Sequence, residues 1–572
     1  MGLLKVLNGF GRDALKSWPL ARKVMRWWRA GHRGYPRWKE LLGANVLRTY
    51  PARPPVKRVL VATSVGAYLP GAGLESLVAA ALAVRGASVD ALLCDGALPA
   101  CSDCLISWYP RLERFVTRGP QADLCSTCFP PAEKMYRALG IPVHRYSTFV
   151  SAEDRVEADR LTQSVPIHEI GSFRLGEIVV GEHAVAGALR FYARGDLEGE
   201  QYGEEVLRRY FHAALLTAYA LRRLLAHMVY DVVVVHHGIY VPMGIIGSAA
   251  RAVGVRVVNW NPAYRKQSFI FSHGDTYHHT LMNEPTDTWE SMQWEPHHEV
   301  ALLDYLKSRW RGTQDWIVFH DRPEENVGRI ARELGVDFGK PCVGLLTNVV
   351  WDAQLHYPAN AFSGMIDWLI QTIRYFATRP DLQLLIRIHP AEIRGAIPSR
   401  QLAAAEIARA FPVLPVNVIV VPPESQVSTY AAMLQCNAVI IYGTKTGVEL
   451  TSVGKPVIVA GEAWIRNKGI TLDASSRDEY FELLDSLPLD SPELPAEVVR
   501  RARRYAYHFF FRRMIPVRSV EPTPGWPPFQ VRVAGIQSLA RGSDPGMDVI
   551  CDGILSGSPF VYPAERGERR DA

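Results

Sequence analysis

Short apolar runs, each ended by a small polar turn, recur in the second half of the chain. They occupy residues 342–346, 384–388, 438–442 and 456–460. Unbroken apolar runs of this length are typical of parallel strands that are covered by helices on both faces. We therefore predict a parallel α/β domain over residues 341–480. Ligands of such sheets bind outside the carboxyl ends of the strands.

The first half of the chain shows a related pattern. Residues 58–63 and 89–94 read as strands, separated by a glycine-containing loop (64–73) and a helix (74–85), and residues 232–235 and 255–260 read as two more strands. This order predicts a Rossmann-like domain over residues 56–298. The fold class is thus α/β, with two Rossmann-like domains facing a central cleft. Outside the domains we expect a basic amphipathic segment and linker at 1–55, a helical connector at 299–340, and C-terminal helices and a tail at 481–572, including one helix over 498–514.

Two of the polar turns carry chemistry suited to a phosphorylated ligand. His389 is followed by Pro390, which holds the imidazole in an extended geometry at a strand end. The turn at residues 443–447 combines two glycines with two threonines and a lysine. It fits neither the nucleotide triphosphatase nor the dinucleotide fingerprint. The alternatives are a structural histidine and an ordinary polar connector.

These segments resemble the C-terminal half of bacterial capsule polysaccharide biosynthesis proteins, which are glycosyltransferases of the two-Rossmann-domain (GT-B) type. The similar stretches are residues 387–390, 442–449, 454–457 and 464–471. The resemblance implies that the His-Pro pair and the hydroxyl-rich loop contact the nucleotide of a sugar donor, CMP-activated in several members. The Thr-Lys-Thr turn and Lys468 depart from the family pattern and would also suit the diphosphate of a UDP-sugar. The implied donor-binding residues are Arg387, His389, Pro390, Glu392, Thr444, Lys445, Thr446, Gly447 and Glu449.

The N-terminal domain supplies the candidate catalytic groups. Glu75, Asp95 and His237 lie near predicted strand ends or the loops that follow them. An inverting transferase needs a base for the proton of the acceptor hydroxyl, and among the three candidates the pKa of His237 suits that task best. A structural role is the alternative for each of the three. Asp352, after the first strand of the second domain, is a candidate for a donor ribose or for a helix cap.

Four of the eight cysteines form two Cys-x-x-Cys pairs in an insert at residues 94–130. Cys101, Cys104, Cys125 and Cys128 match the spacing of a four-thiolate structural zinc site. Reduced thiols or a redox role are the alternatives. We predict structural zinc and no organic cofactor.

Composition limits the function classes. The chain has 572 residues, 48% of them hydrophobic and 21% charged, and a net charge of +6, which describes a globular protein. No nucleic-acid-binding motif is present, no apolar run reaches the length of a membrane span, and no signal peptide is recognisable. Residues 1–35 mix basic residues with tryptophans, which indicates either contact with an anionic membrane or a helix packed on the protein. We expect a cytoplasmic protein, with a peripheral position at the inner face of the membrane if that segment binds lipid.

Together these features predict a glycosyltransferase that moves a sugar from a CMP- or UDP-activated donor to a surface polysaccharide or a lipid-linked acceptor. The enzymatic alternative is a non-hydrolysing nucleotide-sugar epimerase, which shares the twin-Rossmann architecture. The non-enzymatic alternative is a scaffold of a polysaccharide assembly complex.

Overall fold

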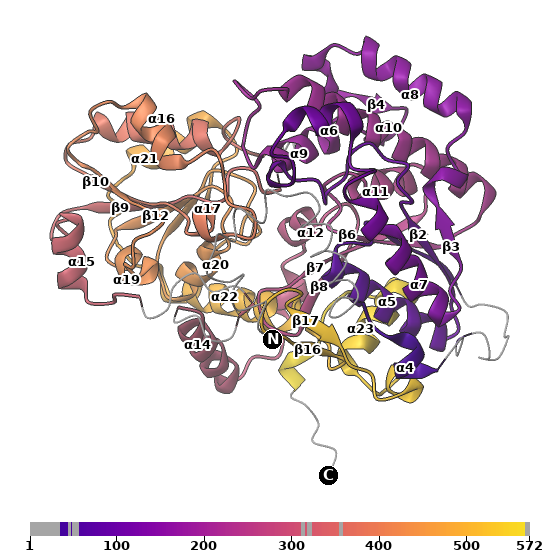
Figure 1. Cartoon of the computed structure of the whole chain (residues 1–572). Helices are drawn as coiled ribbons and strands as arrows, with labels where there is room; N and C mark the ends of the chain where they lie inside the picture. The colour runs from indigo at the N-terminus through magenta and orange to yellow at the C-terminus, as the bar shows by residue number, and fades with distance from the viewer. Residues whose placement is uncertain are drawn as a thin grey trace, which may run out of the picture.

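The protein is built of two α/β lobes (Figure 1), seen in a computed structural model that describes residues 35–43, 47, 57–310, 315–316, 323–353 and 359–566. The predicted basic segment (residues 1–34 of it) and the predicted linker at 51–55 lie outside the described residues. Membrane contact therefore stays a prediction. No helix in the described part of the chain is both long and apolar enough to cross a membrane.

The N-terminal lobe holds a seven-stranded sheet of order β15-β8-β7-β6-β1-β2-β3. Strands β3, β2, β1, β6 and β7 are parallel, β8 is antiparallel to β7, and β15 is antiparallel to β8. Both faces are buried, as predicted: in β1, Leu60 and Ala62 pack into one core cluster, and Val59 and Val61 into another. The strands are β1 (Arg58–Ser64), β2 (Ser88–Leu93), β3 (Val143–Arg145), β6 (Val232–His236), β7 (Arg256–Pro262), β8 (Ser268–His273) and β15 (Ile515–Pro516).

The C-terminal lobe holds a six-stranded sheet of order β11-β10-β9-β12-β13-β14, parallel throughout. Numbered along the chain, this is the 3-2-1-4-5-6 order of a Rossmann domain. The N-terminal sheet shows the same order in its first five strands, so two Rossmann-like domains face each other. The strands are β9 (Cys342–Leu346), β10 (Gln383–Arg387), β11 (Val418–Val421), β12 (Ala438–Ile441), β13 (Val457–Val459) and β14 (Leu472–Asp473).

The helices of the N-terminal lobe include a group that sequence patterns did not reveal. Helices α8 and α9 each pack on α10, and a short hairpin, β4 (Arg174–Leu175) and β5 (Ile178–Val179), contacts α11 through β5. The predicted loop over 64–73 is wrong in its second half, because α5 begins at Leu69, with Pro70 in its first turn where the missing N–H is tolerated. The helices from α4 to α14 are α4 (Trp38–Leu42), α5 (Leu69–Val84), α6 (Leu112–Arg118), α7 (Phe129–Leu139), α8 (Ala152–Ser164), α9 (Gly181–Tyr192), α10 (Gly203–His227), α11 (Met243–Ala252), α12 (Tyr277–Asn283), α13 (Asp287–Glu290) and α14 (Pro296–Trp310).

After the second sheet the chain returns to the first lobe (Figure 1). The predicted helix over 498–514 ends early: α22 (Ala496–Tyr507) passes into a π-helical turn, His508–Arg512, which lets the consecutive Phe509 and Phe510 both be buried. The chain then forms β15 in the N-terminal sheet and the hairpin β16 (Val520–Pro522) and β17 (Phe529–Val531), and α23 (Pro545–Ser556) packs on α5. The remaining helices are α15 (Val327–Leu334), α16 (Met365–Ala377), α17 (Ala391–Arg394), α18 (Ala403–Ala410), α19 (Thr429–Met433), α20 (Thr446–Ser452) and α21 (Arg477–Asp485).

Candidate active site

The strand order of the C-terminal sheet reverses between β9 and β12, and the predicted loops gather at that edge. Thr347 follows β9, His389 follows β10, and the 443–447 turn follows β12. The backbone N–H of His389 donates to Thr347 Oγ1 (2.9 Å). Because all three strands are parallel, the two polar turns singled out in the sequence share one edge of the sheet. That edge is where ligands of this fold bind.

His389 is held in a defined tautomer. Its Nδ1 accepts a hydrogen bond from the backbone N–H of Ala391 at the start of α17 (3.0 Å). In a neutral ring the proton must then lie on Nε2. Nε2 is then the donor nitrogen of this ring, and a donor is what a phosphate oxygen requires.

Arg387 and Glu392 serve the structure around this edge. The Arg387 guanidinium donates to the carbonyls of Pro422 and Ser425 (3.0 Å for Ser425), and burial lowers its pKa to about 10, so it remains charged at neutral pH. Glu392 accepts from the backbone N–H of Ala403, the first residue of α18 (2.9 Å). Both side chains tie loops of the C-terminal lobe together.

A buried ion network lies behind the 443–447 turn. Glu449 is fully buried, and its carboxylate accepts from Arg309 Nη2 (3.1 Å), Lys445 Nζ (3.2 Å) and the Tyr430 hydroxyl (2.6 Å). Burial alone would raise the pKa of Glu449, but Arg309 and Lys445 hold it at about 2. Arg309 is also paired with Asp315. Glu449 is therefore occupied inside the protein rather than presented to a ribose.

Lys445 is the network member nearest to the cleft. Its ammonium lies 4.7 Å from the centre of the Tyr264 ring, which belongs to the N-terminal lobe, and burial lowers its pKa. Thr444 and Thr446 are linked through their hydroxyls (3.2 Å) beside it. Gly447 allows α20 to approach β12 closely, because a Cβ there would lie 2.7 Å from Ile441 Cδ1. Sequence reasoning missed Arg309, Asp315 and Tyr430, and no local motif marks them.

The N-terminal sheet reverses between β1 and β6, and aromatic rings gather there. Tyr68, in the loop after β1, stacks on His236 at the end of β6 with 4.8 Å between the ring centres. His237 follows with φ of +64°, a left-handed conformation that is uncommon for residues with a side chain. Its buried Nδ1 has no hydrogen-bond partner within the described residues, and burial lowers its pKa to about 4.

Glu75 and Asp95 are placed differently from His237. Glu75 lies within α5, is 1% exposed, and accepts from Trp260 Nε1 (2.9 Å); burial raises its pKa to about 7. The predicted helix over 74–85 already contained Glu75, but the sequence did not reveal its contact with Trp260. Asp95 follows β2, one strand away from the reversal, and accepts from the backbone N–H of Ser147 (3.2 Å).

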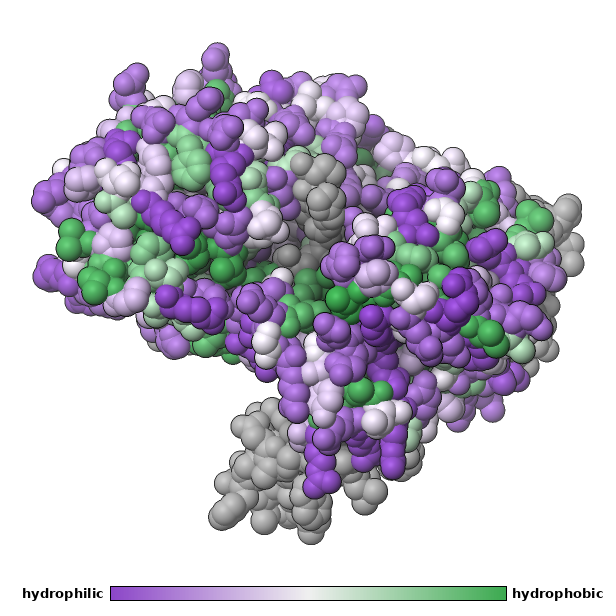
Figure 2. Space-filling view, turned by 90° about the horizontal axis from the view of Figure 1, so that it is seen from above, coloured by the Kyte–Doolittle hydropathy of each residue, from purple (hydrophilic) through white to green (hydrophobic). Residues whose placement is uncertain are grey.

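Several side chains join the two lobes across the cleft. The Tyr240 hydroxyl donates to Asp352 Oδ1 (3.0 Å), and Trp464 Nε1 donates to His278 Nδ1 (2.8 Å). His279 lies between Asp275 (2.7 Å) and Glu462 (3.3 Å). Asp352 thus contacts the opposite lobe and lies near His237, whose pKa its charge raises. In Figure 2 the boundary between the lobes is hollowed, and hydrophobic residues gather along part of it.

Lys468 is committed to the lobe interface. It is 1% exposed and donates to the carbonyls of Met282 (3.0 Å) and Glu284 (2.7 Å) at the end of α12. It is therefore not positioned to bind a donor phosphate. Of the two lysines that the sequence suggested for a phosphate, Lys445 is the one that lies at the edge of the C-terminal sheet.

The predicted zinc ligands are only partly brought together. Cys101 Sγ and Cys104 Sγ lie 3.8 Å apart. Two thiolates bound to one tetrahedral zinc at about 2.3 Å would be about 3.8 Å apart, so this pair fits one edge of such a site. Burial and the nearby thiols Cys101 and Cys94 raise the pKa of Cys125. Across the residues that the structure describes, however, no three or more His, Cys, Asp or Glu side chains are grouped to hold a metal. Zinc stays a prediction.

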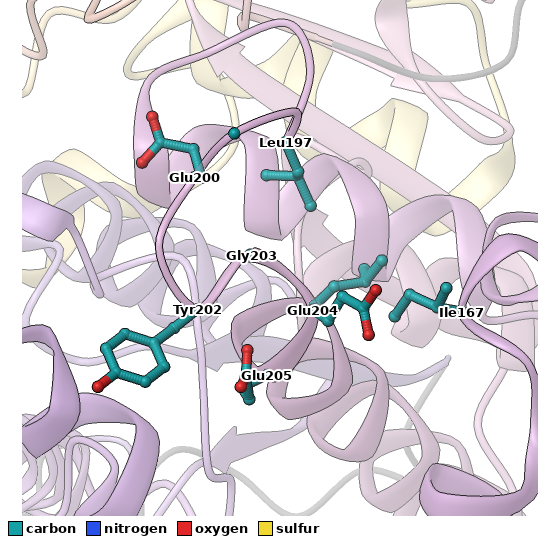
Figure 3. Close-up of a pocket in the computed structure, with 9 residues that line it drawn as sticks. Ile167, Leu197, Glu200, Tyr202, Gly203, Glu204 and Glu205 are labelled. Carbon is teal, nitrogen blue, oxygen red and sulfur yellow. The ribbon is translucent and has the colours of Figure 1, made fainter.

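A separate hollow of about 410 Å³ lies at the start of α10 (Figure 3). Glu200, Glu204 and Glu205 contribute carboxylates to its lining. Glu200 is paired with Arg194 (3.3 Å) and Arg400 (3.0 Å), and the carboxylates of Glu204 and Glu205 disfavour a phosphate, so this hollow is unsuited to a nucleotide donor. The groups that favour an anion lie instead at the edge of the C-terminal sheet.

No family model and no curated protein sequence matches the chain. Solved structures similar to it include the β-Kdo 2,4 transferase KpsC of Thermosulfurimonas dismutans (13% identity, TM-score 0.33, 50% of this chain and 82% of that chain). Another is UDP-GlcNAc 2-epimerase of Neisseria meningitidis bound to UDP-GlcNAc, at 11% identity and a TM-score of 0.24 over 78% of this chain and 94% of that chain. A third is sucrose-phosphate synthase of Thermosynechococcus elongatus, at 13% identity and a TM-score of 0.30 over 79% of this chain and 95% of that chain. The set thus contains both transferases and epimerases, and likenesses with TM-scores this low carry no argument about which chemistry this chain performs.

Proposed function

We propose that this protein is a GT-B-type glycosyltransferase that moves a sugar from a nucleotide-sugar donor to a surface polysaccharide or a lipid-linked glycan. The observation that carries the proposal is the chemistry at the two strand-order reversals, which face each other across one cleft. One presents groups that suit a departing phosphate, and the other presents an unprotonated imidazole. Transfer of a glycosyl group needs both.

The donor would bind at the C-terminal reversal. His389 Nε2 and the Lys445 ammonium supply hydrogen-bond and charge stabilisation for the phosphate, and the hydroxyls of Thr444 and Thr446 lie beside them. Stabilising the charge that develops on the leaving group is commonly the largest contribution to such catalysis. With Lys468 bound elsewhere, a CMP-sugar and a UDP-sugar are both compatible with this set.

The acceptor would bind at the N-terminal reversal, with His237 as the base. At neutral pH a histidine whose pKa is about 4 is unprotonated, and its Nδ1 lone pair can take the proton of the acceptor hydroxyl. The acceptor oxygen then forms a bond to the anomeric carbon while the bond from that carbon to the phosphate oxygen breaks. The electron pair leaves with the nucleotide.

Calorimetric titration with CMP, UDP and GDP tests the donor site. We expect one nucleotide to bind selectively and His389→Ala to weaken it about 10-fold or more, the size of a charge-assisted hydrogen bond. The exposed His168, mutated to alanine, is the matched control and should bind as the unaltered protein does. A folded protein that binds none of the three nucleotides would overturn the proposal in favour of a scaffold.

A second assay separates transfer from epimerisation. The protein is incubated with the nucleotide-sugar that carries the selected nucleotide, with and without glycan acceptor. Release of free nucleotide only when acceptor is present supports a transferase. Conversion of the donor sugar into its epimer without acceptor would identify an epimerase instead.

A further inference from the structure

An exposed tryptophan stands at the tip of the β16–β17 hairpin. Trp526 is 49% exposed and is the aromatic member of the large hydrophobic side chains exposed on the described part of the chain, the others being valines and leucines. The hairpin turn is closed by a hydrogen bond from the backbone N–H of Thr523 to the carbonyl of Pro528 (2.8 Å). Phe529, at its base, is buried against Phe269 (5.4 Å between ring centres). The indole is therefore presented to solvent on an anchored support.

Trp526 begins a row of rings that ends at the candidate base. Its ring lies 6.1 Å from that of Tyr68, Tyr68 stacks on His236 at 4.8 Å, and the His236 ring lies 5.6 Å from the His237 ring. The row crosses the reversal between β1 and β6, the place where a sheet of this order binds its ligand. Residues from three distant parts of the sequence thus form one continuous row of rings, which runs inward from the exposed indole to the partly buried sheet edge.

The surroundings of the row favour a sugar over a lipid. Trp526 is flanked by prolines and by the exposed polar residues Glu521 and Gln530, and it is a single ring rather than a broad apolar patch. Indole and phenol rings offer rigid, amphipathic area that loses little conformational entropy on binding. The flat C–H face of a pyranose matches such a ring, while its hydroxyl groups remain available to the polar rim.

We propose that Trp526, with Tyr68 packed beside it, forms a subsite on which a pyranose of the acceptor glycan stacks, remote from the hydroxyl that reacts at His237. The inference rests on the proposed function for the identity of the acceptor. The position of the subsite depends only on the ring geometry. Because the row of rings leads from the open surface to the sheet edge, we expect the protein to hold an extended glycan.

Binding to a microarray of bacterial surface-polysaccharide fragments tests the subsite without requiring catalysis. We expect Trp526→Ala to lower binding of the fragments that the unaltered protein retains by about 10-fold, the size of one ring-stacking contact. Trp526→Phe, which keeps a ring, should retain most of the binding. Val229→Ala, at a position 81% exposed in the same lobe, is the matched control and should change nothing.

Nucleotide calorimetry on the same variants separates the two proposals. Trp526→Ala should bind the donor nucleotide as the unaltered protein does, since the indole lies on the acceptor side. Glycan binding that depends on Trp526 supports the subsite even if no nucleotide binds, which would sink only the transferase proposal. Fragments bound equally with and without the indole, or no fragment bound by the unaltered protein, would overturn the subsite.

Discussion

The two Rossmann sheets have the same strand order up to their fifth strands but opposite chemistry where that order reverses. In the C-terminal lobe the reversal is backed by charged side chains: Glu449, Arg309 and Lys445 form one buried network. In the N-terminal lobe the reversal is lined by the rings of Tyr68, His236 and His237. The backbone thus sets the same place for a ligand in both lobes, and the side chains give the two places different chemistry, charged in one and aromatic in the other.

The difference has an energetic side. A buried charge must be paired because its desolvation is unfavourable by several kcal/mol, so the C-terminal network is strongly coupled. Stacked neutral rings have no such requirement, and a base such as His237 can be left with an unused lone pair. We therefore expect substitutions in the C-terminal lobe to affect stability as much as binding, and those in the N-terminal lobe to affect activity selectively.

The largest expected effect is on turnover. His237→Gln should lower kcat by about 10²–10⁴-fold, the contribution of a positioned base, without changing nucleotide affinity. The base must be unprotonated, so activity of the unaltered enzyme should hold at neutral pH and fall as the pH drops through about 4. Steady-state kinetics across pH check both statements, with His168→Gln as the control. Full activity in the His237 variant would remove this residue from the reaction.

The next effect is on folding. Glu449→Gln should lower the free energy of unfolding by about 3–5 kcal/mol, because Lys445 would lose its paired anion inside the protein and Arg309 would keep only Asp315. Urea denaturation measures it. The exposed pair Glu157 and Arg160 provides the control, and Glu157→Gln should leave the free energy of unfolding nearly unchanged, because solvent screens this pair. Equal effects of the two substitutions would contradict the contrast between the lobes.

The same network predicts an acid limit to stability. The pKa of Glu449 is about 2 in the folded protein, below the ordinary value of about 4.3. A carboxylate whose pKa is lowered on folding stabilises the fold when the pH is above its pKa in the unfolded chain. This stabilisation is lost as the pH falls from about 4.3 toward 2. Glu449→Gln should remove that part of the pH dependence.

Metal content sharpens the comparison from the N-terminal side. If the cysteine pairs bind zinc, elemental analysis should find one zinc per chain, and Cys101→Ser or Cys125→Ser should lose it together with several degrees of thermal stability. Cys342→Ser is the matched control: Cys342 and Cys436 have a similar sulfur separation (3.9 Å) in the C-terminal core but lack a second pair. Protein purified without added chelator that holds no zinc would rule the prediction out.

The smallest expected effect is at the junction of the lobes. Burial opposes protonation of His279, but hydrogen bonds from His279 to Asp275 and Glu462 raise its pKa to about 9. A histidine whose pKa is raised on folding stabilises the fold when the pH is below its pKa in the unfolded chain, about 6.5. This stabilisation is lost as the pH rises from about 6.5 through 9. Over this pH range, His279→Gln should remove about 1 kcal/mol of the change in the free energy of unfolding. The effect is small because the ion pair of His279 with Asp275 is partly open to solvent. A slope that persists in the variant would assign it to another group.

Local patterns predicted much of the fold and one edge of the site. The apolar runs gave the buried strands, and the parallel order that follows brought His389 and the 443–447 turn to one edge. Patterns failed where the local signal was ambiguous. The glycines before Leu74 favoured a loop, yet α5 begins at Leu69. Glu75 lies on the predicted helix, but no pattern indicated that it accepts a hydrogen bond from Trp260.

What the sequence by itself determined is the class of the protein: two parallel α/β domains whose polar strand ends hold a histidine, a lysine and a second histidine. These follow from periodicity and composition, which report burial residue by residue. Only the tertiary structure decided the partners. Arg309 reaches Glu449 across 140 positions, and Trp526 meets Tyr68 from the far end of the chain. Such pairs depend on how whole elements pack, and no local pattern of residues encodes that packing.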